Sequence, residues 1–93
     1  MAHALQFLPS ALKEWQRIDG DLRQQFKNKL AERLEMPRVL ADRLRGADDR
    51  YKIKLRAAGY RLVYSVDDAA TTVTVVAVGR RDANAVYDAA ARR

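Results

Sequence analysis

Hydrophobic and polar residues alternate with a period of two along residues 50–66, which read RYKIKLRAAGYRLVYSV. Such alternation is typical of strands that bury one side and expose the other. The short connection at residues 56–59 contains a glycine, so the two alternating runs predict a β-hairpin. The register that brings every apolar pair together is Leu55 opposite Tyr60, Ile53 opposite Leu62, and Tyr51 opposite Tyr64.

The same register gathers basic residues on the other side of the hairpin. Lys54 falls opposite Arg61, and Lys52 lies on the same side two residues away. Like charges that face each other across a strand pair are destabilising by roughly a few tenths of a kcal/mol or more. Any one of these residues, taken alone, is most simply a solvated surface cation. The whole set is better explained as a functional site, where local folding rules are often broken, and comprises Lys52, Lys54, Arg56 and Arg61.

An apolar run and a helical repeat precede the hairpin. Residues 2–8 are largely apolar and predict a strand that ends at a proline. Ser10 is expected to be the N-cap of a first helix. Leu12, Trp15 and Ile18 recur at helical spacing and predict the apolar stripe of that helix.

A second helix is predicted after the break at Asp19 and Gly20. The spacing from Asp21 to Gln24 is that of a capping box, with aspartate in place of serine or threonine. Pro37 is expected to end this helix. The residues that repeat every four positions and should face the core are Leu22, Phe26, Leu30 and Leu34.

The segments around and after the hairpin predict further extended structure. Residues 40–46 are ambiguous and predict a turn followed by a short strand around residues 43–45. The β-branched run at residues 71–78 predicts a strand, after which residues 79–81 are expected to leave the sheet.

A last helix completes the predicted fold. Asp82 is expected to cap a short, alanine-rich helix at residues 83–91. Val76 and Val78 do not suit a wholly polar outer face, so part of that face should be covered. The element order predicts one α+β domain at residues 1–93, an antiparallel sheet with an N-terminal helical hairpin on one face and a short C-terminal helix. The basic side is expected to remain an open surface beside the last helix.

The composition indicates a polyanionic partner. The chain has 18 lysines and arginines against 12 aspartates and glutamates, which gives a net charge of +6 and a pI near 10.1. Such a balance favours nucleic acid or an acidic protein. Because cysteine is absent, disulfides and thiolate metal sites are excluded. The opening residues predict no signal peptide, and no apolar run is long enough to predict a membrane span.

Few residues remain as candidates for chemistry. The single histidine, His3, is most simply solvated or hydrogen-bonded, and it is too isolated to predict a metal site. A cluster of cations with one aromatic residue suits the binding of a phosphodiester and the stacking of a base. It would also stabilise the charge that builds up at phosphorus when RNA is cleaved by its own 2′-OH, and neighbouring cations favour a neutral lysine as the base. The candidates are Lys52, Lys54, Arg61, Arg80, Arg81 and Tyr87.

Several stretches of the chain resemble the RelE toxin family of bacterial toxin–antitoxin systems, within the RelE/ParE superfamily. They extend over nearly the whole sequence and read ALKEW, LEMPR, RLRG, YKIKLRAAGYRLVY, VGRR and VYDAA. The resemblance implies a small cytoplasmic endoribonuclease of microbial-ribonuclease-like fold, with no metal or other cofactor. It implies cleavage of messenger RNA in the A site of the 70S ribosome by 2′-OH attack. It also implies a RelB-like antitoxin, operator DNA bound only by the toxin–antitoxin complex, and no membrane association.

The resemblance also assigns roles by position. Lys52 and Lys54 would act as base and charge stabilisers. Arg61 would hold the scissile phosphate, Arg81 would assist the leaving group, and Tyr87 would stack on the RNA. Further contacts to RNA or the ribosome would come from Arg45, Arg56 and Arg80, the last of which stands where the family commonly has lysine.

Two other functions stay open at this point. A ParE-type toxin has a related fold but poisons DNA gyrase, and chains of that type are expected to lack the basic set with Tyr87. A non-catalytic basic module would only bind nucleic acid or an acidic partner, and single substitutions would weaken its binding only modestly.

Overall fold

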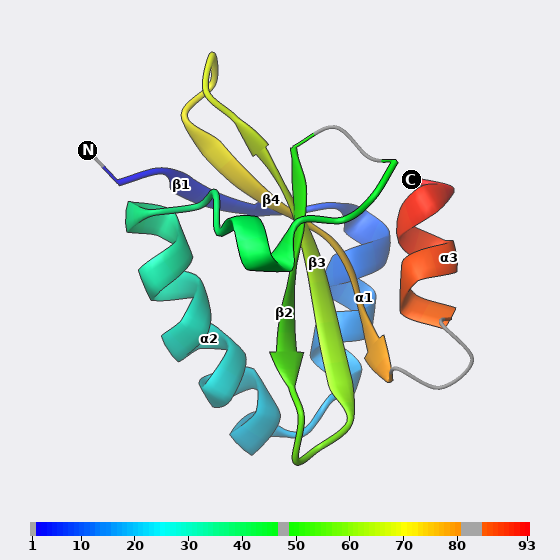
Figure 1. Ribbon diagram of the computed structural model, residues 1–93. Helices are drawn as coiled ribbons and strands as arrows, with labels where there is room; N and C mark the ends of the chain where they lie inside the picture. Colours follow the sequence, from blue (N-terminus) through cyan, green and yellow to red (C-terminus); the bar gives the residue numbers. More distant parts are fainter. Residues whose placement is uncertain (1, 47–48, 81–84) are drawn as a thin grey trace.

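A four-stranded sheet forms the centre of the computed structural model, which describes residues 2–46, 49–80 and 85–93 (Figure 1). The strand order is β1-β4-β3-β2. Helices α1 and α2 pack on one face of the sheet, and α3 packs on the other. The elements in chain order are β1 (Ala4–Phe7), α1 (Pro9–Arg17), α2 (Gly20–Glu35), the 3₁₀ helix η1 (Leu40–Asp42), β2 (Arg50–Leu55), β3 (Tyr60–Asp67), β4 (Thr72–Arg80) and α3 (Ala85–Ala91). The predicted α+β architecture is confirmed.

The hairpin of β2 and β3 has the predicted register. Leu55 pairs with Tyr60, and Lys54 pairs with Arg61. The connection at residues 56–59 ends in Gly59, whose φ of 68° lies in the left-handed region that glycine tolerates without strain. Local alternation of apolar and polar residues was therefore sufficient to set this pairing.

The sheet is mixed, so the prediction of a purely antiparallel sheet was wrong for β1. Strand β1 pairs in parallel with β4, with Ala4 beside Thr72 and Phe7 beside Val75. The direction of β1 depends on where the α1–α2 hairpin returns the chain, and no local pattern of residues sets that direction.

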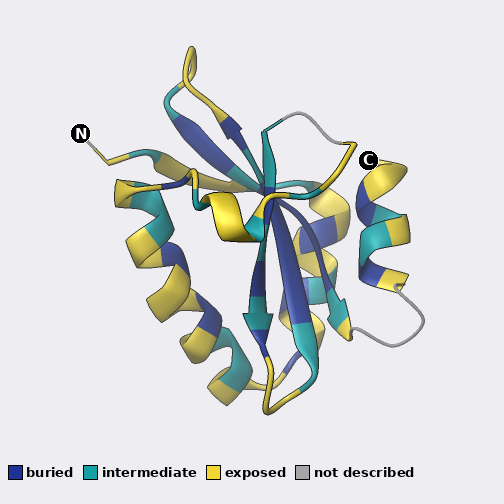
Figure 2. Cartoon of the chain, viewed as in Figure 1, coloured by how far each residue is buried: buried dark blue, intermediate teal, exposed yellow. Residues whose placement is uncertain are grey.

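The core between the sheet and the first two helices is rich in aromatic residues. The Phe7 and Trp15 rings lie 5.2 Å apart, and the Trp15 and Phe26 rings lie 6.2 Å apart. Phe26 and Leu30 of α2 are fully buried, as the fourfold repeat predicted. Figure 2 shows the central strands largely buried and the outward sides of α1 and α2 exposed.

Both helices begin earlier than predicted. Pro9 is the first residue of α1 and follows Leu8 in an extended conformation, so Ser10 is not the N-cap. Proline suits this position because the first helical N–H has no partner within the helix. Helix α2 begins at Gly20 after Asp19, so the expected capping box from Asp21 is not formed.

The apolar stripe of α1 also differs by one position from the prediction. Ala11, Trp15 and Ile18 are buried, whereas Leu12 is 40% exposed. The stripe follows the spacing i, i+4, i+7 from Ala11, which leaves Leu12 beside it.

The segment before β2 contains less strand than predicted. Helix η1 closes with the Arg43 N–H bonded to the Leu40 carbonyl at 3.2 Å. Arg43 then forms a single bridge to Tyr51 instead of a short strand. The Leu44 N–H donates to the Arg50 carbonyl at 2.9 Å, beside this bridge.

Strand β4 is longer than predicted. Gly79 pairs with Arg61 and Arg80 pairs with Tyr60, so these two residues stay in the sheet instead of leaving it. The predicted cap at Asp82 and the predicted helix start at Ala83 lie outside the described residues. Within residues 2–46, 49–80 and 85–93, no helix combines the length and the apolar character needed to cross a bilayer.

Candidate functional site

The strand pairing places the predicted hairpin cations on the face that α3 covers in part. Residues directly opposite in an antiparallel pair share a face, so Lys54, Arg61 and Gly79 form one row across β2, β3 and β4. Lys52 lies in the next row, opposite Val63. Sequence alternation had predicted that these three cations share one side of the hairpin, and this is confirmed.

Helix α3 covers the part of this face that lies beside the cations. Val86 and Ala90 of α3 pack against Val63, Val76 and Ala77 in a small apolar cluster. The predicted cover over Val76 is therefore confirmed, whereas Val78 belongs to the core on the opposite face. A β-bulge opposite Val63 and Tyr64 inserts one extra residue into β4, so Val76 and Val78 lie on opposite faces of the sheet.

The prediction of an open basic surface was wrong for Arg61. The residue is only 6% exposed, and its Nη1 donates a hydrogen bond to the Tyr60 carbonyl at 3.0 Å. Lys52 and Lys54 are half-buried. A charge removed from water is costly unless it is paired, so a buried guanidinium on this face is well suited to an anionic ligand.

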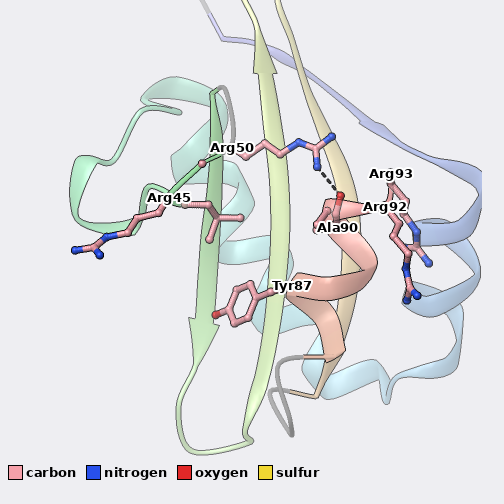
Figure 3. A pocket seen from close by; sticks show the side chains of 9 residues that line it. Arg45, Arg50, Tyr87, Ala90, Arg92 and Arg93 are labelled. Atoms are coloured by element: carbon pink, nitrogen blue, oxygen red, sulfur yellow. Dashed lines mark hydrogen bonds between the residues drawn. The ribbon is translucent and has the colours of Figure 1, made fainter.

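Tyr87 reaches this face from α3. Figure 3 shows its ring projecting from the helix toward β2. The ring borders a cleft of about 610 Å³ between α3 and the chain segment that leads into β2. The residues that line this cleft are Leu44, Arg45, Gly46, Arg50, Tyr87, Ala90, Ala91, Arg92 and Arg93.

Arg50 is a residue of this face that the sequence pattern alone had not singled out. Its Nη1 donates to the Ala90 carbonyl at 2.5 Å and so ties β2 to α3 (Figure 3). The signal was present in the sequence, because the period of two that groups Lys52 with Lys54 also includes Arg50.

Of the other predicted cations, the three that the structure describes lie at different places. Arg80 lies over the Tyr60 ring at 5.8 Å, and its Nε is 3.5 Å from the tyrosine oxygen, so it stands on the face of α1 and α2. Arg56 is exposed in the loop between β2 and β3. Arg45 lines the cleft, but its guanidinium points away from α3 (Figure 3). Arg81 lies outside the described residues.

A polar network behind β2 holds the strand that carries the lysines. Arg33 of α2 donates to the Lys52 carbonyl at 3.3 Å, to the Tyr64 oxygen at 2.8 Å, and to Asp42 at 2.7 Å. The Tyr64 hydroxyl donates in turn to the Pro37 carbonyl at 2.6 Å. Burial raises the pKa of Tyr64 above its ordinary value, although the hydrogen bond from Arg33 opposes that change. The network fixes the backbone of β2 at Lys52.

The described residues do not suggest a metal centre. His3 Nε2 lies 3.3 Å from a carboxylate oxygen of Asp68, whereas its Nδ1 is buried without a hydrogen-bond partner among the described residues, so the satisfied histidine predicted from the sequence is found at one ring nitrogen only. Within the described part of the chain, no group of three or more histidine, cysteine, aspartate or glutamate side chains could hold a metal ion.

Comparison with known proteins identifies clear relatives. Residues 5–85 match the family model described as the ParE toxin of type II toxin–antitoxin system, parDE. The chain is 50% identical to the mRNA interferase toxin RelE of Escherichia coli over 93 residues, which cover 100% of this chain and 98% of the relative.

Solved structures of RelE are similar over most or all of the chain. A doubly substituted variant of E. coli RelE in the free state superposes with a TM-score of 0.92 at 50% identity, over 100% of this chain and 98% of that one. The intact E. coli RelBE toxin–antitoxin complex contains a chain that matches with a TM-score of 0.84 at 51% identity, over 87% of this chain and 99% of that one.

Proposed function

The chain belongs to the RelE type of the RelE/ParE toxins of type II toxin–antitoxin systems, and we propose that it cleaves messenger RNA in the ribosomal A site. It is an mRNA endoribonuclease that inhibits translation. The observation that carries this proposal is the pairing of Lys54 with Arg61 on the face that Tyr87 overlooks. Like charges at opposite positions destabilise a strand pair, and an RNA phosphate between them would remove that repulsion.

The reaction is attack of a 2′-OH on the neighbouring phosphorus, with loss of the 5′ oxygen. Lys52 and Lys54 remove the 2′ proton and stabilise charge at phosphorus. Arg61, held by the Tyr60 carbonyl, binds the scissile phosphate with a fixed guanidinium. Preorganised cations aimed at developing charge commonly contribute more to such catalysis than any other single effect.

Tyr87 and Arg81 complete the proposed catalytic set, and three further arginines make contacts around it. Tyr87 stacks on a base, and the adjacent cleft of about 610 Å³ has room for a nucleotide. Arg81, which lies outside the described residues, assists the leaving oxygen by neutralising its charge. Arg45 at the rim of the cleft contacts flanking RNA, and Arg56 and Arg80 make more peripheral contacts to RNA or the ribosome.

The ribosome supplies the in-line geometry that this site does not enforce by itself. Correct orientation of reacting groups is worth several kcal/mol of barrier. Because the ribosome is the site of cleavage in this proposal, the toxin acts on A-site codons in the cytoplasm. A RelB-like antitoxin neutralises it, and only the toxin–antitoxin complex binds operator DNA and represses the operon.

Cleavage of messenger RNA on programmed 70S ribosomes tests this function. We expect cleavage within the A-site codon on ribosomes and little cleavage of the same free RNA. Tyr87→Ala should lose most of the activity while it keeps the fold and antitoxin binding. Equal rates on free and ribosome-bound RNA would contradict the proposed dependence on the ribosome.

Gyrase poisoning is the second candidate function, because the matched family model is described as a ParE toxin. It is less favoured, since the chain is 50% identical to an mRNA interferase over its full length and retains the basic set with Tyr87. A supercoiling assay with purified gyrase separates the two functions. Trapped cleavage complexes without any cut in ribosome-bound messenger RNA would favour gyrase.

A further inference from the structure

Tyr87 stands on a helix that has little apolar attachment of its own. Helix α3 has seven described residues, of which only Val86 and Ala90 are buried. Isolated helices of this length are marginal in water, and alanine and valine bury little area. Tyr87 and Ala89 are only partly buried against the same cluster, so the position of the Tyr87 ring over the face that carries Lys52 and Lys54 should also depend on other contacts.

One such contact joins Arg93, two residues beyond the end of α3, to α1. The Arg93 guanidinium meets the Glu14 carboxylate in a two-pronged ion pair, with Nη1 2.8 Å from Oε1 and Nη2 3.3 Å from Oε2. Both side chains are largely buried, at 24% and 28% exposure. Two parallel bonds between a guanidinium and a carboxylate set direction as well as distance, which suits a contact that orients a helix.

The same pair occupies the open edge of β4. Strand β1 ends at Phe7, and its last bond to β4 runs from the Leu8 N–H to the Val75 carbonyl. Beyond that point Glu14 accepts the Val78 N–H at 3.1 Å, and Arg93 donates to the Val76 carbonyl at 3.0 Å. The ion pair thus satisfies backbone groups that a longer β1 would otherwise pair, since strand edges need partners for both donors and acceptors.

A second contact holds α3 from the other side. Arg50 of β2 donates to the Ala90 carbonyl, in the last turn of the helix (Figure 3). Ala90 is one turn beyond Tyr87, so it lies on the part of α3 that sets the orientation of the ring. The helix is therefore held from β2 on one side and from α1 and β4 on the other.

We propose that Glu14 and Arg93 are positioning residues for Tyr87: their ion pair on the edge of β4 fixes α3 and so orients the tyrosine for RNA. The proposal rests on the proposed function, in which Tyr87 stacks on the substrate. Arg93 also lines the cleft beside Tyr87, but in this proposal it acts through the position of the tyrosine ring and not through a contact to RNA. Small displacements of a positioned group can lower a rate by about 10²-fold, so the effect should be measurable.

A double-mutant cycle tests the proposal on programmed ribosomes. Arg93→Ala should lower the cleavage rate at saturating toxin about 10- to 100-fold in the otherwise wild-type chain. In a Tyr87→Ala background the same substitution should cause no further loss, because Arg93 acts through that ring. Equal fold-losses in both backgrounds would overturn the proposal, and so would an unchanged rate for Arg93→Ala.

Three further variants test whether a lower cleavage rate results from the lost ion pair or from a general loss of folding. Glu14→Gln keeps an acceptor for the Val78 N–H but weakens the charged pair, so it should give a smaller loss than Arg93→Ala. Arg93→Lys should recover part of the rate, because it keeps the charge and loses the fork. Arg17→Ala, an exposed residue on the same helix as Glu14, removes one positive charge and should cleave like the wild type.

Hydrogen exchange separates this proposal from the proposed function. Amides of α3 should exchange faster in Arg93→Ala than in the wild type, while amides of α2 stay unchanged, whether or not the chain cleaves RNA. Unchanged exchange in α3 would overturn the positioning role. A wild-type chain that cuts no ribosome-bound RNA, but shows the change in exchange, would contradict only the proposed function.

Discussion

The two faces of the sheet differ in what holds them together. Under α1 and α2 the contacts are large and apolar, with Trp15, Phe26 and Tyr64 among the buried side chains. Under α3 the apolar cluster consists mainly of valine and alanine, and the cations lie beside it. One face therefore supplies most of the apolar area buried on folding, and the other carries the charges.

Strand β3 shows the division within a few residues. Leu62 and Tyr64 face the aromatic core, whereas Arg61 and Val63 face α3. Alternation lets one strand serve both faces, because successive side chains point to opposite sides. A strand that is stabilised from one side can therefore tolerate repulsive charges on the other.

The largest expected effect is the loss of a core aromatic residue. Phe26 is fully buried, so Phe26→Ala should lower the free energy of unfolding by about 3–5 kcal/mol. Val86→Ala in α3 removes about two methylene equivalents and should lower it by about 1.5–2 kcal/mol. Urea unfolding followed by circular dichroism measures both values. Equal losses would mean that the two faces contribute alike to stability, contrary to the difference in their packing.

The next effect concerns activity on the charged face. Lys54→Ala should lower cleavage of ribosome-bound RNA about 10²–10³-fold, which is the usual range for removal of one charge-stabilising group. The free energy of unfolding should stay the same or increase, because the repulsion with Arg61 is removed. Single-turnover cleavage and urea unfolding measure the two quantities.

Lys29→Ala is the matched control for this prediction, since Lys29 is an exposed lysine on α2, away from the charged face. It should leave both the cleavage rate and the unfolding midpoint close to wild type. A Lys54→Ala variant that cleaves normally would show that the paired cations are a tolerated surface feature and not part of the site.

Sequence reasoning succeeded where the pattern was local. The register of β2 with β3 followed from alternation alone, and it placed Lys54 opposite Arg61. It failed for Arg80, which was expected to leave the sheet near the site. Because β4 continues to that residue, the pairing with Tyr60 turns its side chain to the opposite face.

Contacts between distant segments could not be predicted from the sequence. Glu14 and Arg93 are 79 residues apart, and each alone is an ordinary surface charge in the sequence. The direction of β1 likewise depends on the return path of two helices. The tie from Arg50 to Ala90 required the position of α3, which no periodicity gives.

The smallest expected effect comes from the network that supports the charged face from behind. Tyr64→Phe removes the hydroxyl that accepts from Arg33 and donates to the Pro37 carbonyl, so the free energy of unfolding should fall by about 1–3 kcal/mol. Urea unfolding at neutral pH measures this loss. Tyr51→Phe is the matched control, because the Tyr51 ring stacks on Tyr64 at 5.7 Å and the substitution keeps that ring in place.

The pH dependence of stability gives a second test of the same hydroxyl. Burial raises the pKa of Tyr64 in the folded state, so the unfolded chain loses the phenolic proton first as the pH rises. The contribution of the neutral phenol is complete below the unfolded pKa of about 10 and is lost as the pH increases through the higher folded value. The wild type should therefore lose stability more steeply than Tyr64→Phe between about pH 9 and pH 11. Parallel curves for the two proteins would mean that the Tyr64 hydroxyl ionises as readily in the folded chain as in the unfolded one, so the polar support behind Lys52 would be open to solvent.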